Sequence, residues 1–154
     1  MTYIAQSPFI TKGYWLGVKD GDMRAFALYQ RHYSYKAYRD QRRRNGLMMG
    51  PGEKLLLLTY NCDAIFGWRK FKDDSGQRGI NCNIFRNESP IKSSVLIEEA
   101  VEIAWQRWPG ERLYTYINPR AVRSSNPGYC FLKAGWKKCG ITKWNKLLIM
   151  ERQP

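Results

Sequence analysis

The sequence predicts an α/β fold in which helices flank a mixed central sheet. Apolar segments of strand length recur along the chain, and one long amphipathic segment separates two of them. A helix between two strands is the usual crossover of a parallel pair, whereas short turns join antiparallel strands. The length of 154 residues and the 44% hydrophobic content suit a single domain over residues 1–154 with its own core.

Six segments rich in aliphatic and aromatic residues are predicted to be strands. Polar turns separate the second, third and fourth, which are expected to form an antiparallel meander. The fourth and fifth flank the long helix and are expected to pair in parallel. In chain order the predicted strands are 14–18, 55–60, 64–71, 80–85, 113–117 and 146–150.

Three helices are predicted from apolar spacing and from the residues that begin and end them. In the clearest, apolar residues recur on one face and Ser94 is the predicted cap. Asp20 or Asp22 is predicted to cap the first helix. The predicted helices are 23–29, 94–108 and 128–134.

Charge and aromatic content indicate a polyanionic partner. The chain has 26 Lys and Arg against 13 Asp and Glu, a formal net charge of +13, and 14% aromatic residues. A positive field attracts nucleic acid, and aromatic rings stack on bases, so DNA is the predicted partner. A basic protein with an aromatic core would have the same composition.

No membrane partner is expected, because no apolar stretch is long enough to cross a bilayer. The first residues lack a signal-peptide pattern, so a cytoplasmic location is expected, within the host cell if a phage encodes the chain. The oligomeric state stays open.

The histidine and cysteine content bears on catalysis and metal binding. His32 is the only histidine, and since imidazole titrates near neutral pH it is a candidate base, with a structural role as the alternative. Cys62, Cys82, Cys130 and Cys139 show no C-x-x-C spacing, so no metal site is predicted. They are expected to be reduced thiols.

A basic run follows the first predicted helix. Residues 31–44 hold six Lys or Arg against one acid. Such a run is typical of contacts with DNA phosphates, although a solvated basic face would look the same. The predicted phosphate contacts are Lys36, Arg39, Arg42, Arg43 and Arg44.

Two polar loops are candidate binding segments. In residues 86–94 a strand ends and the long helix begins, and a helix N-terminus with Arg86, Ser93 and Ser94 could hold a phosphate. Glu88 lies at the strand's end, where side chains can face a cleft. The loop 118–127 is rich in hydrogen-bonding groups, which often form sites after a buried strand. Its candidate substrate-binding residues are Asn118, Arg120 and Arg123. Ordinary solvated loops are the alternative for both segments.

The segment 126–136 resembles the "N…Y-x-x-x-G-F" segment near the C-terminus of GNAT acyltransferases. In that family an asparagine and a tyrosine lie close to the thiol end of acyl-CoA. Asn126 and Tyr129 match them, and Trp136 is the aromatic residue after the glycine. The basic chain also resembles the Mom-type DNA-modification proteins, a divergent GNAT branch that modifies adenine in phage DNA. Residues 31–34, 85–88 and 116–136 carry this second resemblance.

The resemblance implies a GNAT-like fold and transfer of a small group to the exocyclic amine of adenine, which would protect phage DNA from host restriction. It implies Tyr129 as the acid at the leaving group and His32 or Glu88 as the base. Arg86 and the helix start near Ser94 would hold the donor or a phosphate, and Asn126 would contact the cofactor and orient the substrate. The alternatives are a non-catalytic basic nucleic-acid-binding protein and a GNAT enzyme acting on a small amine or a protein.

The chain departs from ordinary GNAT enzymes at one point. The family places Q/R-x-x-G-x-G/A before its main helix, where backbone N–H groups cradle the CoA pyrophosphate. Residues 87–94 contain no glycine there. Acyl-CoA or a related donor is therefore not assigned from this segment.

Overall fold

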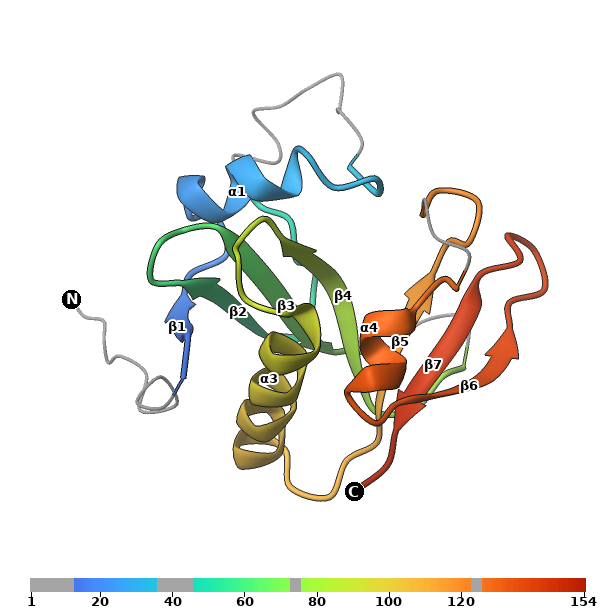
Figure 1. Cartoon of the computed structure of the whole chain (residues 1–154). Coiled ribbons are helices and arrows are strands. Elements are labelled where there is room, and N and C mark those ends of the chain that lie inside the picture. Colours follow the sequence, from blue (N-terminus) through green and yellow to red (C-terminus); the bar gives the residue numbers. More distant parts are fainter. Residues whose placement is uncertain (1–12, 36–45, 73–75, 123–125) are drawn as a thin grey trace.

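A mixed sheet runs through the part of the chain that the computed structural model describes, which is residues 13–35, 46–72, 76–122 and 126–154 (Figure 1). Seven strands and three helices lie within these ranges. In chain order they are β1 (Trp15–Val18), α1 (Met23–Tyr29), β2 (Glu53–Thr59), β3 (Ala64–Lys70), β4 (Ile80–Asn87), α3 (Ser93–Arg107), β5 (Leu113–Ile117), α4 (Tyr129–Lys133), β6 (Lys137–Ile141) and β7 (Leu148–Arg152). The predicted α/β class with a mixed sheet is confirmed.

The strand order across the sheet is β1-β2-β3-β4-β5-β7-β6. Strands β2, β3 and β4 form the predicted antiparallel meander. Strands β4 and β5 pair in parallel across the α3 crossover, as predicted, but only between residues 80–82 and 113–115. Strand β7 then pairs antiparallel with both β5 and β6.

Helices cover both faces of the sheet, and this explains the unbroken apolar run in β2. Leu55 and Leu57 belong to the core on the α3 and α4 side, whereas Leu56 and Leu58 pack with α1 on the other side. A strand buried on both faces needs apolar residues at every position, not at alternate ones.

Two tryptophans hold α3 against the sheet. The indole N–H of Trp15 donates to the Leu96 carbonyl at 2.9 Å, and that of Trp68 donates to the Ala100 carbonyl at 2.9 Å. Both rings are fully buried, so each polar N–H is satisfied where water cannot reach it. These bonds fix the helix that links the two parallel strands.

The two helix starts differ in how they are capped. Asp22 caps α1, since its carboxylate accepts from the N–H groups of Arg24 and Ala25. Asp20 instead accepts from the N–H groups of Met48 and Met49 at 2.8 and 3.2 Å. The prediction that Ser94 caps the long helix is wrong, because α3 begins one residue earlier and its cap, Lys92, makes no side-chain cap bond.

Strand β6 was not among the predicted strands. All five of its residues are exposed, so it shows neither an apolar run nor an alternation that sequence patterning could detect. The last strand begins at Leu148, two residues later than predicted, because Lys146 lies in the preceding turn with φ of 54°. Among the described residues, no helix combines the length and apolar character required to cross a bilayer.

Candidate functional site

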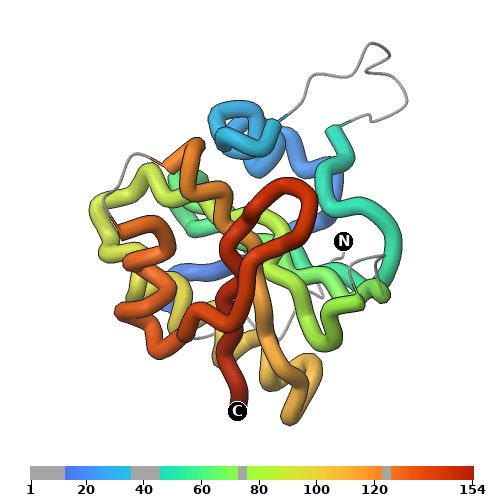
Figure 2. The backbone as a smooth tube through the Cα atoms, turned by 90° about the vertical axis from the view of Figure 1, so that its right-hand side faces the viewer, coloured from blue at the N-terminus to red at the C-terminus, as the bar shows by residue number. Residues whose placement is uncertain are grey.

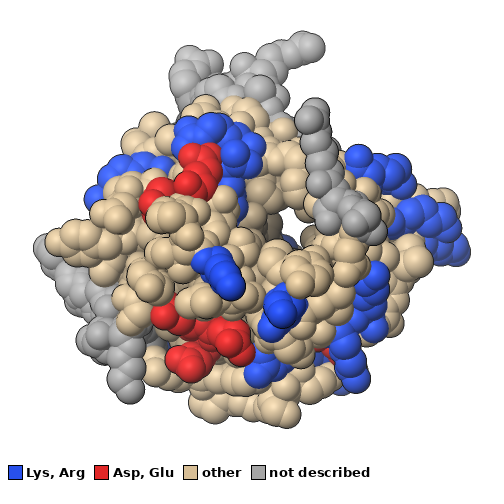
Figure 3. Space-filling view, in the orientation of Figure 1, with Lys and Arg blue, Asp and Glu red and all other residues tan. Residues whose placement is uncertain are grey.

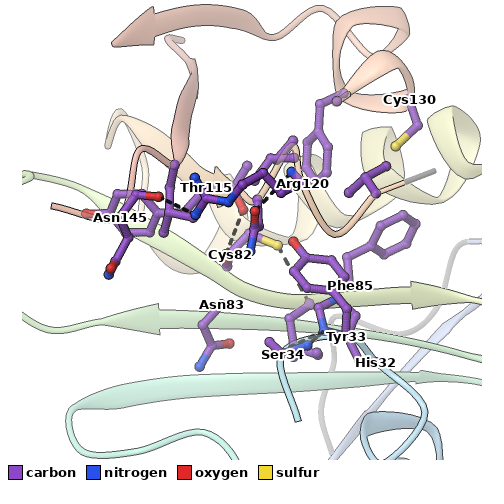
Figure 4. Close-up of a pocket in the computed structure, with 18 of the residues that line it drawn as sticks. His32, Tyr33, Ser34, Cys82, Asn83, Phe85, Thr115, Arg120, Cys130 and Asn145 are labelled. Carbon is purple, nitrogen blue, oxygen red and sulfur yellow. Dashed lines mark hydrogen bonds between the residues drawn. The ribbon is translucent and has the colours of Figure 1, made fainter. Parts of the chain in front are cut away.

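The parallel strands part beyond their short pairing, and a cavity lies between them. Past Cys82 and Thr115, β4 continues along β3 while β5 continues along β7. The cavity has a volume of about 630 Å³ and is lined from both strands, from the segment after α1, from α4 and from the β6–β7 hairpin (Figure 4). It lies at the carboxyl ends of the parallel strands, the place where open α/β sheets usually bind ligands.

The residues that follow α1 form one wall of the cavity. Turn bonds from the N–H of Arg31 to the Leu28 carbonyl (3.1 Å) and from the N–H of His32 to the Tyr29 carbonyl (2.9 Å) extend the helical path by one turn. This path brings His32, Tyr33 and Ser34 to the cavity lining. The hydroxyl oxygen of Tyr33 accepts from the backbone N–H of Asn118, and this bond connects the wall with the end of β5.

His32 is held as a neutral imidazole. Its Nδ1 accepts from the backbone N–H of Ser34 at 3.1 Å and lies 2.7 Å from the Ser34 hydroxyl oxygen. Burial, followed by the nearby Arg86 guanidinium, lowers the pKa of His32 to about 4, against a weaker opposing effect of the Phe85 backbone. At neutral pH the ring is uncharged, and its Nδ1 lone pair faces the serine hydroxyl. The pair can therefore take up a proton from a group bound in the cavity.

Glu88 lies between two arginines. Its Oε2 accepts from the Nε of Arg31 and from the Nε of Arg86, each at 2.6 Å, and its Oε1 accepts from the Nη2 of Arg31 at 2.9 Å. The side-chain bonds from Arg31 and then Arg86 lower the pKa of Glu88 to about 2. Both Glu88 oxygens already accept from arginines, and Glu88 lies outside the cavity lining, so the geometry favours His32 over Glu88 as the base. The ion pairs tie the wall after α1 to the end of β4.

The loop after β5 supplies two of the predicted substrate-binding residues. Asn118 and Arg120 both line the cavity, and the Arg120 N–H donates to the Asn118 side-chain oxygen at 3.1 Å. The Arg120 guanidinium also donates to the backbone carbonyl of Asn145 at 2.8 Å (Figure 4). This bond holds the tip of the β6–β7 hairpin at the cavity.

The predicted phosphate site at the start of α3 does not join the cavity. Ser93 and Ser94 lie outside its lining, and so does Arg86. The Asn87 side chain donates to the Ile91 carbonyl (2.7 Å) and the Ser93 hydroxyl (3.0 Å). The side chains of Asn87 and Ser93 are therefore engaged within the loop, and phosphate binding at the start of α3 stays a prediction.

The α4 helix presents other residues to the cavity than the resemblance implies. Tyr129 is 54% exposed and lies outside the lining, and Asn126 is also outside it. Cys130 and Phe131 line the cavity instead. Successive residues of a helix point about 100° apart, so placing Phe131 in the core turns Tyr129 toward solvent. Tyr129 is therefore not a lining residue of this cavity, and its role as the acid at the leaving group stays a prediction.

Six of the predicted DNA- and substrate-binding residues fall in the ranges 36–45 and 123–125. Lys36, Arg39, Arg42, Arg43, Arg44 and Arg123 lie outside the described residues. The sequence drew attention to residues 31–34, which include Ser34, but three polar lining residues on other segments carried no signal. These residues are Asn83, Thr115 and Asn145.

The thiols and carboxylates do not gather into a metal site in the described part of the chain. All four cysteines are free. Burial raises the pKa of the Cys82 thiol to about 12, so this cavity residue stays protonated at neutral pH. Ser34, His32 and the amides in the lining offer hydrogen bonding and proton transfer to a group bound in the cavity.

The cavity between β4 and β5 thus combines a neutral imidazole, His32, with asparagine side chains and Arg120. Comparison of the chain with models of known protein families, with curated proteins and with solved structures gave no match.

Proposed function

We propose that the chain is a DNA-base-modifying transferase of the Mom type with a GNAT-like fold, which transfers a small group to the exocyclic amine of adenine. The target base occupies the cavity between β4 and β5. A volume of about 630 Å³ is in the range of small-molecule sites and exceeds what a single base needs. A base in a duplex is shielded by its neighbours, so it must leave the stack to enter.

The observation that carries the proposal is the Ser34–His32 pair. When the amine nitrogen attacks the donor, a new bond to that nitrogen forms and the leaving group departs with its electron pair. The nitrogen must then lose one proton. Ser34 accepts this proton at its hydroxyl oxygen while its own hydroxyl proton passes to Nδ1 of the neutral His32, which lies 2.7 Å from that oxygen.

Charge supports nucleic acid as the substrate. The chain carries a net charge of +13, and residues 112–146, which include the loop and hairpin at the cavity, hold eight Lys or Arg and no acid. Amides from Asn118 and Asn145 lie in the lining and offer both donors and acceptors for a base. No donor is assigned, because the segment before α3 contains no glycine and Ser93 and Ser94 lie outside the cavity lining.

The test is mass spectrometry of nucleosides from the DNA of cells that express the chain. The unaltered chain should shift the mass of deoxyadenosine, and His32→Gln or Ser34→Ala should lower the modified fraction by about 10²- to 10⁴-fold. Tyr60→Phe serves as the control, since Tyr60 is 80% exposed on the β2–β3 turn and outside the cavity lining.

Two outcomes would contradict the proposal. If the unaltered chain shifts no nucleoside while it still binds DNA, it is a binding protein and not a modifying enzyme. If His32→Gln modifies DNA normally while Tyr129→Phe does not, the chemistry takes place at α4 and the cavity assignment is wrong.

A further inference from the structure

The tip of the β6–β7 hairpin, residues 142–147, presents a tryptophan to solvent. Trp144 is 84% exposed, more than any other large hydrophobic side chain in the described part of the chain. The tip is internally bonded, from the Thr142 N–H to the Leu147 carbonyl (2.8 Å) and from the Leu147 N–H to the Thr142 hydroxyl (2.9 Å). A large apolar ring on an ordered, exposed tip suggests a partner that covers it.

Lysines lie along the hairpin that carries the tryptophan, Lys143 and Lys146 at the tip and Lys137 and Lys138 at the far end of β6. Lys137, Lys138, Lys143 and Lys146 of the hairpin are all exposed, and the Lys143 Nζ lies 5.3 Å from the centre of the Trp144 ring. In Figure 3, Lys and Arg gather on the right-hand side of the molecule, where Figure 1 shows the hairpin. An exposed aromatic ring among cations is the combination that binds nucleic-acid strands, since the ring stacks on bases while the cations contact phosphates.

The tip also lies at the mouth of the cavity. Asn145 and Leu147 line the cavity, and the Arg120 guanidinium holds the Asn145 carbonyl at 2.8 Å. Trp144 is therefore one residue, or about 3.8 Å along the chain, from the lining. Figure 2, viewed from the right-hand side of Figure 1, shows the hairpin facing the viewer.

We propose that this tip is a nucleic-acid contact in which Trp144 stacks on a base next to the one in the cavity, with Lys143 and Lys146 at the flanking phosphates. The placement beside the target base rests on the proposed function, whereas the stacking contact itself requires no modification chemistry. A protein or a second copy of the chain would fit less well, because the residues 112–146 offer that partner eight cations and no acid.

The experiment measures binding of fluorescently labelled single-stranded and duplex DNA at fixed salt, with 2-aminopurine at one adenine position of the duplex. Trp144→Ala should weaken binding by about 5- to 100-fold, as expected for loss of one base–aromatic stack. Trp144→Phe should retain most of the affinity. Tyr60→Ala is the matched control, because Tyr60 is 80% exposed and β4 and β5 lie between its turn and the hairpin.

The 2-aminopurine emission gives a second readout, because it rises when the base leaves the stack. The rise should occur with the unaltered chain and with Tyr60→Ala, and it should be lost with Trp144→Ala at saturating protein. Equal affinity and equal emission for Trp144→Ala and the unaltered chain would overturn the contact. The proposed contact would also be overturned if Trp144→Ala changed only the self-association of the chain, measured by sedimentation, and not its binding to DNA.

Failure of this contact and failure of the proposed function give different results. If no nucleoside is modified but Trp144→Ala still weakens binding, the contact stands and the modification does not. If Trp144→Ala modifies DNA normally and binds DNA with unchanged affinity, the proposed modification stands and the proposed contact does not.

Discussion

The neutral state of His32 predicts a pH dependence of stability that His32→Gln should remove. The pKa of His32 is lowered from 6.5 to about 4 by burial and by the Arg86 guanidinium. Between these values the unfolded chain binds a proton that the folded chain does not, so the folded state loses stability as the pH falls from about 7 toward 4. Above the unfolded pKa this contribution is fully present.

The magnitude follows from the size of the shift. At about 1.36 kcal/mol per pKa unit, the full loss below pH 4 is about 3 kcal/mol, and about 2 kcal/mol of it is lost by pH ~4.5. Glutamine has a similar polar side chain but does not titrate. The Ser34 and Phe85 backbone groups that face His32 do not titrate, so the difference between the two chains isolates the imidazole.

The assay is urea unfolding at about pH 7 and about pH 4.5, followed by circular dichroism, for the unaltered chain and for His32→Gln. The unaltered chain should lose about 2 kcal/mol more free energy of unfolding between the two pH values than the variant does. An equal loss in both would show that folding does not lower the pKa of His32, and this account of its burial would then be wrong.

Two further predictions concern the sheet and the partner. Gly67→Ala places a methyl group 2.6 Å from the Asn83 side-chain oxygen and 2.8 Å from the Met49 sulfur, so we expect about 1–3 kcal/mol of destabilisation and a melting temperature lower by about 2–10 °C. Gly140→Ala is the control and should change the melting temperature little, because its methyl group meets only Ile149 at 3.5 Å. Equal melting curves for the two variants would contradict this prediction. DNA affinity should fall with salt, with a logarithmic slope near −0.9 per phosphate contact, and a titration that is flat from about 50 to about 200 mM salt would exclude an electrostatic interface.

The parts of the fold that follow local patterning were predictable. The apolar run of β2 and the amphipathic helix α3 are properties of short stretches of sequence, and the parallel pairing of β4 and β5 follows from the crossover between them. The positions of Asn118 and Arg120 at the cavity could also be predicted from local sequence, because residues just after a buried strand lie at the edge of the sheet.

The other features of the fold and of the candidate site depend on contacts between residues that are far apart in the sequence. Glu88 pairs with Arg31, 57 positions away, and nothing local indicates that this contact ties the wall after α1 to β4. Likewise, which of Tyr129 and Cys130 faces the cavity depends on how α4 rotates to bury Phe131. Strand β6 was missed because it is defined by its pairing with β7 and not by burial.

The position of β6 as an outermost strand of the sheet has a consequence for aggregation. An unpaired strand edge can template the addition of another chain, and proteins commonly protect such edges with lysines and with irregular pairing. Strand β6 has both, since Lys137 and Lys138 are exposed and the register with β7 shifts between Lys138 and Gly140. Mutual repulsion of these lysines opposes edge-to-edge growth of the sheet into fibrils. The hairpin can therefore stay exposed without becoming the site at which the protein aggregates.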